Sequence, residues 1–247
     1  MAEGGTEPES SAWPAASAVP DPPWRKEPRS GRVPLTRDAI VDAALRVLDA
    51  DGIDGLSMRR VGEELKVGAA SIYWHVRNKD ELLQLILERV IAEMRLPEPD
   101  PGHWKEQLRE YAFAVRDVLN SHRDVARISM GRIPSGPQIA VVMEWLYTLL
   151  TPAGIPAQVI AYSSDLFALF VGAFAFEESL GPSTGDIPPE QFLEMMKDYL
   201  RSLPPDRFPY TSKAVDLIMS GGRDERFAFG VDVLLRGLES YASQAPG

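Results

Sequence analysis

The sequence has no cysteine among its 247 residues. Without thiols the chain can form neither a disulfide framework nor a thiolate zinc site, and it has no cysteine nucleophile. The N-terminus also lacks a basic segment followed by an apolar run, so we expect no secretory signal. These absences are compatible with a reducing compartment, and we expect a cytoplasmic protein.

Long hydrophobic runs are also scarce. The most apolar stretch runs from Leu166 to Phe176, which is too short to span a bilayer. Asp165 precedes it, and Glu177 and Glu178 follow it. We interpret the stretch as a buried helix and expect no contact with a membrane; a membrane span is the alternative interpretation.

Sequence patterns that signal catalysis are missing. We find no His-Glu-x-x-His metal motif, no glycine loop for binding phosphate and no nucleophile elbow. The three histidines, His75, His103 and His122, are scattered along the chain. We therefore expect neither an enzyme nor a bound metal or cofactor.

The net charge of −10 argues at first against a nucleic-acid binder, but the charges are unevenly distributed. Residues 25–79 hold 11 Lys and Arg against 8 Asp and Glu, whereas residues 80–247 hold 15 against 24. Solvent screens distant charges within ~10 Å, so a phosphate backbone responds mainly to the local excess of positive charge. The segment 25–79 is therefore suited to DNA.

Residues 1–31 are rich in Pro, Ala, Ser, Gly and Glu and show no apolar period, which predicts a disordered tail. The end of this tail and the residue after it are basic, with Arg25, Lys26, Arg29 and Arg32. Two interpretations stay open: a solvated linker, or an arm that follows phosphates or a minor groove.

From Thr36 onward the apolar residues recur with a helical period. Thr36 is the expected N-cap of the first helix, and Gly52 lies past its expected end. Ser57 caps a short helix, a second short helix spans Ala69 to His75, and Asn78 begins a longer one. Further helices are expected at about 103–120, 122–130, 136–151, 155–180, 189–203, 210–220 and 224–243. No segment alternates with the period of a strand, so the sequence predicts an all-α fold.

A long helix followed by two short helices and a tight turn between them is the geometry of a helix-turn-helix. The residues within this pattern are distinctive. Residues 52–59 read GIDGLSMR, residues 65–68 read LKVG, and residues 71–83 read SIYWHVRNKDELL. These segments closely resemble the signature of the TetR family of transcription regulators.

The resemblance continues toward the C-terminus through Trp104, residues 121–124 and Gly131, and it covers about residues 36–243. This part of the chain resembles the C-terminal domain of the tetracycline repressors. The resemblance implies a helix-turn-helix DNA-binding domain, a connecting helix with a proline-rich hinge, and a ligand-binding and dimerisation domain, at residues 32–80, 81–102 and 103–247.

The resemblance also implies which residues meet DNA. Arg59 can bind guanine O6 and N7 together, and Tyr73 and Lys79 are suitable phosphate donors. Alanine side chains cannot donate hydrogen bonds, so the alanines that open the recognition helix predict fewer direct base contacts. For Trp74, a place in the core is an equal alternative. The predicted set is Arg59, Arg60, Ala69, Ala70, Ser71, Tyr73, Trp74, His75 and Lys79.

In this family the C-terminal helices form the dimer and hold a small-molecule cavity. We expect a homodimer, with packing inside one subunit as the alternative for each interface residue; these are Ala168, Gly172, Ala175, Leu234, Leu235 and Leu238. The expected cavity residues, each of which would otherwise be ordinary core, are Tyr111, Val115, Leu119, Ser129, Ile133, Met143, Trp145, Leu149, Phe167 and Phe170.

The positions that bind tetracycline and magnesium in the tetracycline repressors hold Arg95, Tyr111, Ser129 and Phe176 here. We therefore expect a more apolar or aromatic effector. Its binding is expected to swing the helix at 79–94 about Pro97–Pro101 and to release a palindromic operator in double-stranded DNA. Besides this ligand-responsive repressor, two alternatives stay open: an activator of the same family, and a small-molecule sensor without DNA binding.

Overall fold

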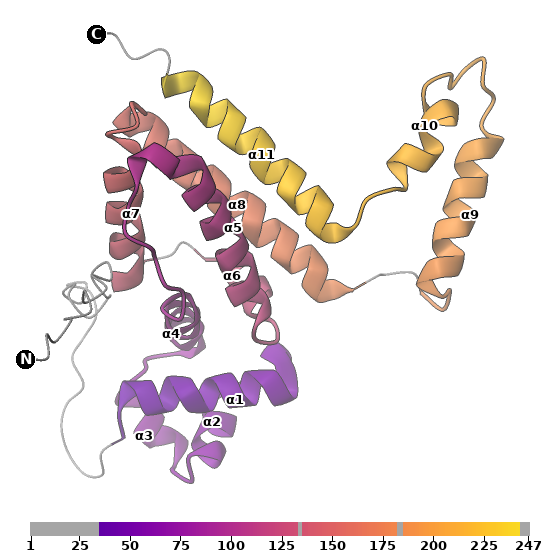
Figure 1. Ribbon diagram of the computed structural model, residues 1–247. Coiled ribbons are helices and arrows are strands. Elements are labelled where there is room, and N and C mark those ends of the chain that lie inside the picture. Colours follow the sequence, from indigo (N-terminus) through magenta and orange to yellow (C-terminus); the bar gives the residue numbers. More distant parts are fainter. Residues whose placement is uncertain (1–34, 133–134, 182–184, 243–247) are drawn as a thin grey trace, which may run out of the picture. The chain divides into compact units, whose positions relative to one another are not determined.

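The computed structural model describes residues 35–132, 135–181 and 185–242, and every regular element in these ranges is a helix (Figure 1). The all-α prediction is therefore confirmed. The expected tail at 1–31 lies outside the described residues. In chain order the elements are α1 (Arg37–Gly55), α2 (Met58–Glu64), α3 (Ala69–Tyr73), α4 (Lys79–Ile91), the 3-10 helix η2 (Pro101–His103), α5 (Trp104–Asn120), α6 (Val125–Met130), α7 (Pro137–Leu150), α8 (Ala157–Leu180), α9 (Pro189–Ser202), α10 (Thr211–Ile218) and α11 (Arg223–Ala242).

Local capping signals begin three of the first four helices, as predicted. The side chains of Thr36, Ser57 and Asn78 each accept a hydrogen bond from the amide three residues further on, at 3.1, 3.2 and 2.8 Å. These bonds satisfy amides that the first turn of a helix leaves without partners. Two boundaries among these helices differ from the prediction: Gly52 adopts a φ of +72° and kinks α1, which then continues to Gly55, and α3 ends at Tyr73 instead of His75.

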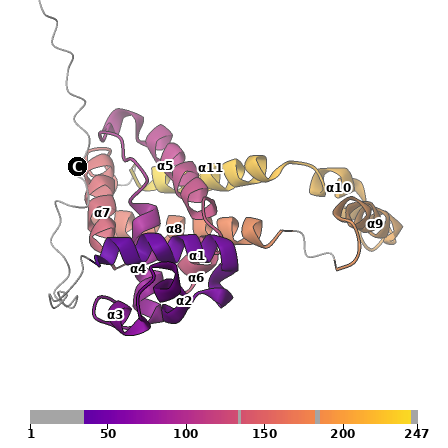
Figure 2. The same cartoon turned by 90° about the horizontal axis from the view of Figure 1, so that it is seen from below.

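An apolar core holds the first four helices together. Ile40 and Leu48 of α1, Ile72 of α3, and Leu82 and Ile86 of α4 are all fully buried. Both views place α2 and α3 together beside α1 (Figure 1, Figure 2). Because Ile72 anchors α3 to this core, the remaining side chains of that short helix are left to face outward.

The turn between α2 and α3 requires a close approach of two backbones. A Cβ on Gly62 would lie only 2.9 Å from the carbonyl oxygen of Val67 and 3.3 Å from the amide nitrogen of Ala69. Lys66, within the turn, adopts a left-handed φ of 56°. Glycine at position 62 therefore sets the tight crossing that orients α3.

The chain divides into two compact units. The first holds α1 to α8 as far as Ser179, together with the end of α11 from Leu235 onward, and the second runs from Leu180 to Leu234. Within the second unit, α9 and α10 pack against each other. The predicted divisions near residues 80 and 102 do not coincide with a boundary between these units, and they stay predictions.

Candidate DNA-binding surface and ligand cavity

Two adjacent aromatic side chains project from the end of α3. Tyr73 is 54% exposed and Trp74 is 63% exposed, whereas Ile72 and Val76 on either side of them are fully buried. Ile72 and Val76 are therefore packing residues, and Trp74 belongs to the surface and not to the core. Because two adjacent exposed aromatic side chains form an apolar patch next to the exposed Arg59, this end of α3 is a candidate contact surface.

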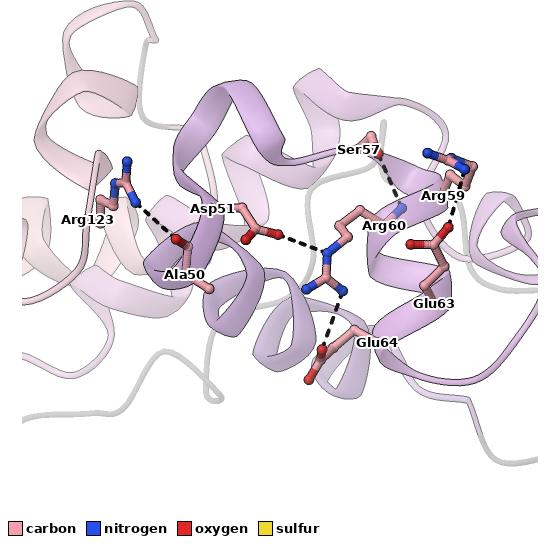
Figure 3. A network of polar contacts seen from close by, with 8 residues as sticks. All are labelled: Ala50, Asp51, Ser57, Arg59, Arg60, Glu63, Glu64 and Arg123. Atoms are coloured by element: carbon pink, nitrogen blue, oxygen red, sulfur yellow. Dashed lines mark hydrogen bonds and ion pairs between the residues drawn. The ribbon is translucent and has the colours of Figure 1, made fainter.

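The two neighbouring arginines of α2 point to different partners (Figure 3). The Arg59 side chain is largely exposed and forms only a loose ion pair, at 3.4 Å, with Glu63 one turn later. Arg60 is held by Asp51 of α1 at 2.8 Å and lies 3.6 Å from Glu64. Arg59 is therefore available to a ligand outside the protein, whereas Arg60, which the sequence placed beside it at the DNA, fastens α2 to α1.

Lys79 is also engaged within the protein. Its ammonium donates a 2.7 Å hydrogen bond to the carbonyl oxygen of Ile53, at the kinked end of α1. Ser71 and His75 are half-buried, and the Nδ1 atom of His75 is buried without a partner among the described residues. Of the predicted set, Arg59, Ala70, Tyr73 and Trp74 are exposed, and Ala69 is half-buried.

A docking corner joins the α5–α6 turn to the end of α1, and the sequence pattern gave no sign of it. Asp49 accepts a hydrogen bond from the backbone amide of Arg123 at 3.0 Å and lies 2.8 Å from the imidazole Nδ1 of His122. The Arg123 guanidinium donates to the Ala50 carbonyl at 3.0 Å (Figure 3). Asp124 accepts from an α1 amide at 2.8 Å. These partners lie more than seventy residues apart in the sequence. Patterns within a short stretch of sequence could therefore not predict these contacts.

A cavity of about 590 Å³ lies among α4 to α8. This volume is in the range of sites for small organic molecules. The predicted residues that line it are Tyr111, Val115, Leu119, Ser129, Met143 and Phe167. The structure adds a wall that the sequence analysis missed, formed by the α4 residues Gln84, Leu87, Glu88 and Ile91.

Tyr111 places a hydroxyl in a mostly apolar wall. Burial raises the pKa of the Tyr111 phenol, which keeps the group protonated and uncharged. Among the described residues, none is recorded as a hydrogen-bond partner of this hydroxyl. Since Tyr111 lines the cavity and its hydroxyl has no protein partner among the described residues, it is suited to bind a polar atom of a ligand.

Three predicted cavity residues that the structure describes do not line the cavity. Trp145 and Leu149 are fully buried on α7 and do not line the cavity. Phe170 pairs with Phe174 along α8, with their ring centroids 6.1 Å apart, and is also absent from the lining. Ile133 lies outside the described residues. Periodicity could place these side chains on an inward face, but it could not separate a cavity wall from solid core.

The predicted set of dimer-interface residues on α8 and α11 also requires a correction. Gly172 lines the cavity and a Cβ there would lie 3.5 Å from the sulfur of Met130, while Ala175 is fully buried. Leu235 and Leu238 are buried within the single chain, and Leu234 is half-buried. Of the predicted interface set, only Ala168 is exposed. The large exposed apolar residues of α8 are instead Tyr162, Leu166, Leu169 and Leu180.

Two family models match this chain. The model described as bacterial regulatory proteins, tetR family, matches residues 40–86. The model described as tetracyclin repressor-like, C-terminal domain, matches residues 96–242. The first range contains the helix-turn-helix, and the second contains most of the cavity lining.

Curated proteins and solved structures give the same picture. An HTH-type transcriptional regulator of Saccharopolyspora erythraea is 34% identical over 165 residues, which span 66% of this chain and 70% of the relative. The HTH-type transcriptional repressor DrrR1 of Streptomyces coeruleorubidus is 29% identical over 228 residues, spanning 90% of this chain and 84% of the relative. The apo structure of ActR from Streptomyces coelicolor has a TM-score of 0.79 and 41% identity, and covers 87% of this chain and all of ActR. A further structure holds ActR in complex with actinorhodin, at 42% identity and the same TM-score.

Proposed function

Because this chain belongs to the TetR family of bacterial regulatory proteins, we propose that it is a homodimeric repressor that leaves a palindromic operator when a small, largely apolar or aromatic molecule fills its cavity. The observation that carries this proposal is that α4 touches both sites. Its N-cap, Asn78, follows the exposed aromatic pair of α3, and its Leu87 and Ile91 line the cavity. We propose a cytoplasmic location and no catalytic role.

On the DNA side, we propose that Arg59 reads a base edge and that Tyr73 and Trp74 contact the backbone. An exposed guanidinium is suited to the paired acceptors of guanine in the major groove. A tyrosine hydroxyl and an indole N–H are donors for phosphate oxygens, which fix register without reading sequence. The alanines at 69 and 70 offer only a methyl contact to thymine. We therefore assign sequence discrimination mainly to Arg59.

We propose that the dimer forms through the exposed apolar face of α8. Tyr162, Leu166 and Leu169 follow one another at spacings of four and three residues, so they lie on one side of the helix. α8 is long and apolar enough to cross a membrane by length and composition. Burial of this face against a second subunit accounts for the same composition. A two-fold dimer also presents two recognition helices, one α3 from each subunit, to successive half-sites of the operator.

We propose that the effector is largely apolar and is anchored at one polar point by the Tyr111 hydroxyl. ActR, which shares 42% of its residues with this chain, binds actinorhodin. No histidine is among the residues that line the cavity, and Ser129 and Tyr111 stand where the tetracycline repressors hold ligands for a drug and its magnesium ion. The lining thus lacks an imidazole, although it contains the carboxylates of Glu88 and Asp165, and we propose an effector that binds without a metal.

The two sites are linked through α4 and through α6. A molecule in the cavity presses on Leu87 and Ile91 of α4 and on Ser129 of α6. The same α4 begins beside the reading helix, and Asp124 at the start of α6 holds the end of α1. A ligand that favours one position of these helices shifts operator affinity by ~1–3 kcal/mol per coupled event. The same coupling must then weaken ligand binding when operator is present.

Selection of random duplex DNA by the purified full chain tests the DNA side. The variant carries Arg59→Ala and Tyr73→Ala, and the control carries Arg201→Ala and Tyr199→Ala, which remove the same residue types from exposed positions of α9. We expect wild type and control to enrich one two-fold symmetric motif, and the variant to enrich none. Failure of wild type to enrich any motif at low salt would contradict the proposal.

Calorimetry tests the cavity, with actinorhodin as the probe. We expect Tyr111→Phe to weaken binding about tenfold, because it removes one hydrogen bond and leaves the ring. Tyr147→Phe is the matched control, since the Tyr147 hydroxyl donates a hydrogen bond to the carbonyl oxygen of Ala157 at the start of α8 and Tyr147 does not line the cavity. Equal affinities of the two variants would refute the anchor. Tight binding of tetracycline with magnesium would refute the apolar effector class.

A further inference from the structure

The connection between α4 and α5 is fastened to the ligand-binding side, although its prolines suggested a free hinge. The Pro97 carbonyl accepts a 2.7 Å hydrogen bond from the indole N–H of Trp145 on α7. Gln107 of α5 donates to the Glu98 carbonyl at 2.8 Å and accepts from the Asp100 amide at 2.9 Å. Three residues of the connection, Pro97, Glu98 and Asp100, are thus bonded to α5 or α7.

The residues just before this fastened stretch are much freer. Met94 still bonds to the Ile91 carbonyl, at 3.2 Å, in the last turn after α4. Arg95 and Leu96 then take part in no recorded hydrogen bond or ion pair among the described residues. A helix can turn most easily where its chain has the fewest bonds, which here is Arg95–Leu96 and not the proline segment.

Trp145 is well placed to define this point. Its side chain is fully buried, so its N–H needs a partner inside the protein, and the Pro97 carbonyl provides it. The ring centroid lies 5.4 Å from that of Tyr111, whose side chain lines the cavity. The hydrogen bond between Trp145 and Pro97 is therefore separated from the ligand cavity by only the rings of Trp145 and Tyr111.

We propose that Trp145 is a positioning residue for operator recognition. By holding Pro97 to α7, its N–H confines the pivot of α4 to Arg95–Leu96. It thereby fixes the position of the DNA-binding domain, residues 32–80, in each subunit of the dimer. This inference rests on the proposed function, because positioning matters only if two such parts meet one operator. A looser pivot lowers affinity for a palindrome, which needs both parts at a set separation, and leaves affinity for a single half-site unchanged.

Two measurements on the full-length protein test the proposal, with Trp145→Phe as the variant. Phenylalanine keeps an aromatic ring against Tyr111 and removes the N–H. Trp104→Phe is the control, since Trp104 is also buried and no described residue is recorded as accepting a hydrogen bond from it. Gln107→Met is a second variant, which removes the other two bonds to the connection.

The first measurement is amide hydrogen exchange over residues 96–103 without DNA or ligand. We expect about tenfold faster exchange in Trp145→Phe and in Gln107→Met, and no change in Trp104→Phe. The second is the affinity for the selected palindrome and for its single half-site. We expect a five- to tenfold loss for the palindrome alone.

The two ideas fail separately. Unchanged exchange at residues 96–103 in Trp145→Phe overturns the fastening of the connection, whatever the DNA results are. Faster exchange with equal losses for palindrome and half-site overturns the positioning role. A wild-type protein that binds no duplex at all overturns the proposed function, and with it the positioning role.

Discussion

Asp124 is the N-cap residue of α6, yet its carboxylate serves α1: it accepts a hydrogen bond from the amide of Ile53 at 2.8 Å and none from its own helix. It adopts a left-handed φ of 61° in doing so. A helix-capping position is thereby used to join the cavity-lining α6 to the DNA-binding part. Four predictions follow this and the other contacts described above.

Asp124→Ala should lower the free energy of unfolding by about 1.5–3 kcal/mol, since it leaves the Ile53 amide without its charged partner. Asp124→Asn should lower it much less, because asparagine tolerates the left-handed conformation and keeps a carbonyl oxygen at the same place. Urea denaturation of both variants provides the comparison. Equal destabilisation by the two substitutions would show that the bond to Ile53 is unimportant.

Gly52→Ala should destabilise the fold by about 1–3 kcal/mol. The backbone there has a φ of +72°, and a Cβ would lie 3.0 Å from the Asp124 carboxylate and 3.1 Å from the Arg123 guanidinium. Gly222→Ala is the control, because nothing lies within 4 Å of its Cβ position. Thermal unfolding should separate the two variants, and a Gly52→Ala protein as stable as the control would contradict the strain argument.

Substitutions at the exposed Trp74 and at the buried Ile72 should have different effects on operator affinity and on the free energy of unfolding. Trp74→Ala should change the free energy of unfolding by no more than about 0.5 kcal/mol, as expected for an exposed side chain, and should weaken operator binding. Ile72→Ala, at the fully buried neighbour, should cost about 2–5 kcal/mol of stability. Denaturation curves combined with DNA titrations would test this. Normal operator affinity in Trp74→Ala would exclude the indole from the interface.

The pair of His103 and Asp100 should produce a pH dependence at the start of α5. A 2.7 Å hydrogen bond to Asp100 raises the pKa of the His103 imidazole, and the same bond lowers the pKa of the Asp100 carboxyl. The histidine's contribution is therefore complete below its unfolded pKa and is lost as the pH rises through its folded value. The carboxyl's contribution is present above its unfolded pKa and is lost as the pH falls through its folded value.

The stabilising window thus lies between the folded pKa of Asp100 and that of His103. Both groups are exposed, so we expect a local effect. NMR titration should give His103 a midpoint above that of an ordinary histidine, and Asp100→Asn should bring it back down. An unchanged His103 midpoint in Asp100→Asn would assign the shift to another cause.

Sequence reasoning succeeded where the determinants are local. Thr36, Ser57 and Asn78 cap helices through bonds to amides three residues away, and such signals can be read directly. The buried positions of Ile72 and Val76 follow from helical periodicity in the same way.

It failed where a side chain chooses among distant partners. Arg59 and Arg60 are identical in type and adjacent in sequence, but only the tertiary structure places Asp51 next to Arg60. Gly172 permits close packing on any side, so its small size could not tell a partner subunit from the interior. The α4 wall of the cavity was missed because residues 81–102 were interpreted as a connecting helix and hinge and the cavity was expected only within residues 103–247.

The docking corner at the end of α1 depends heavily on main-chain atoms of that helix. Arg123 binds the carbonyl of Ala50, Asp124 binds the amide of Ile53, and Lys79 binds the carbonyl of Ile53. Apart from Asp49 and Asp54, which pairs with Arg127 at 3.5 Å, the side chains of this end of α1 can then change without loss of the junction. A DNA-reading segment from a relative can consequently be grafted onto this effector-binding body if it preserves Asp49, Gly52, Asp54 and Lys79 at the junction and leaves the cavity-lining residues of α4 in place.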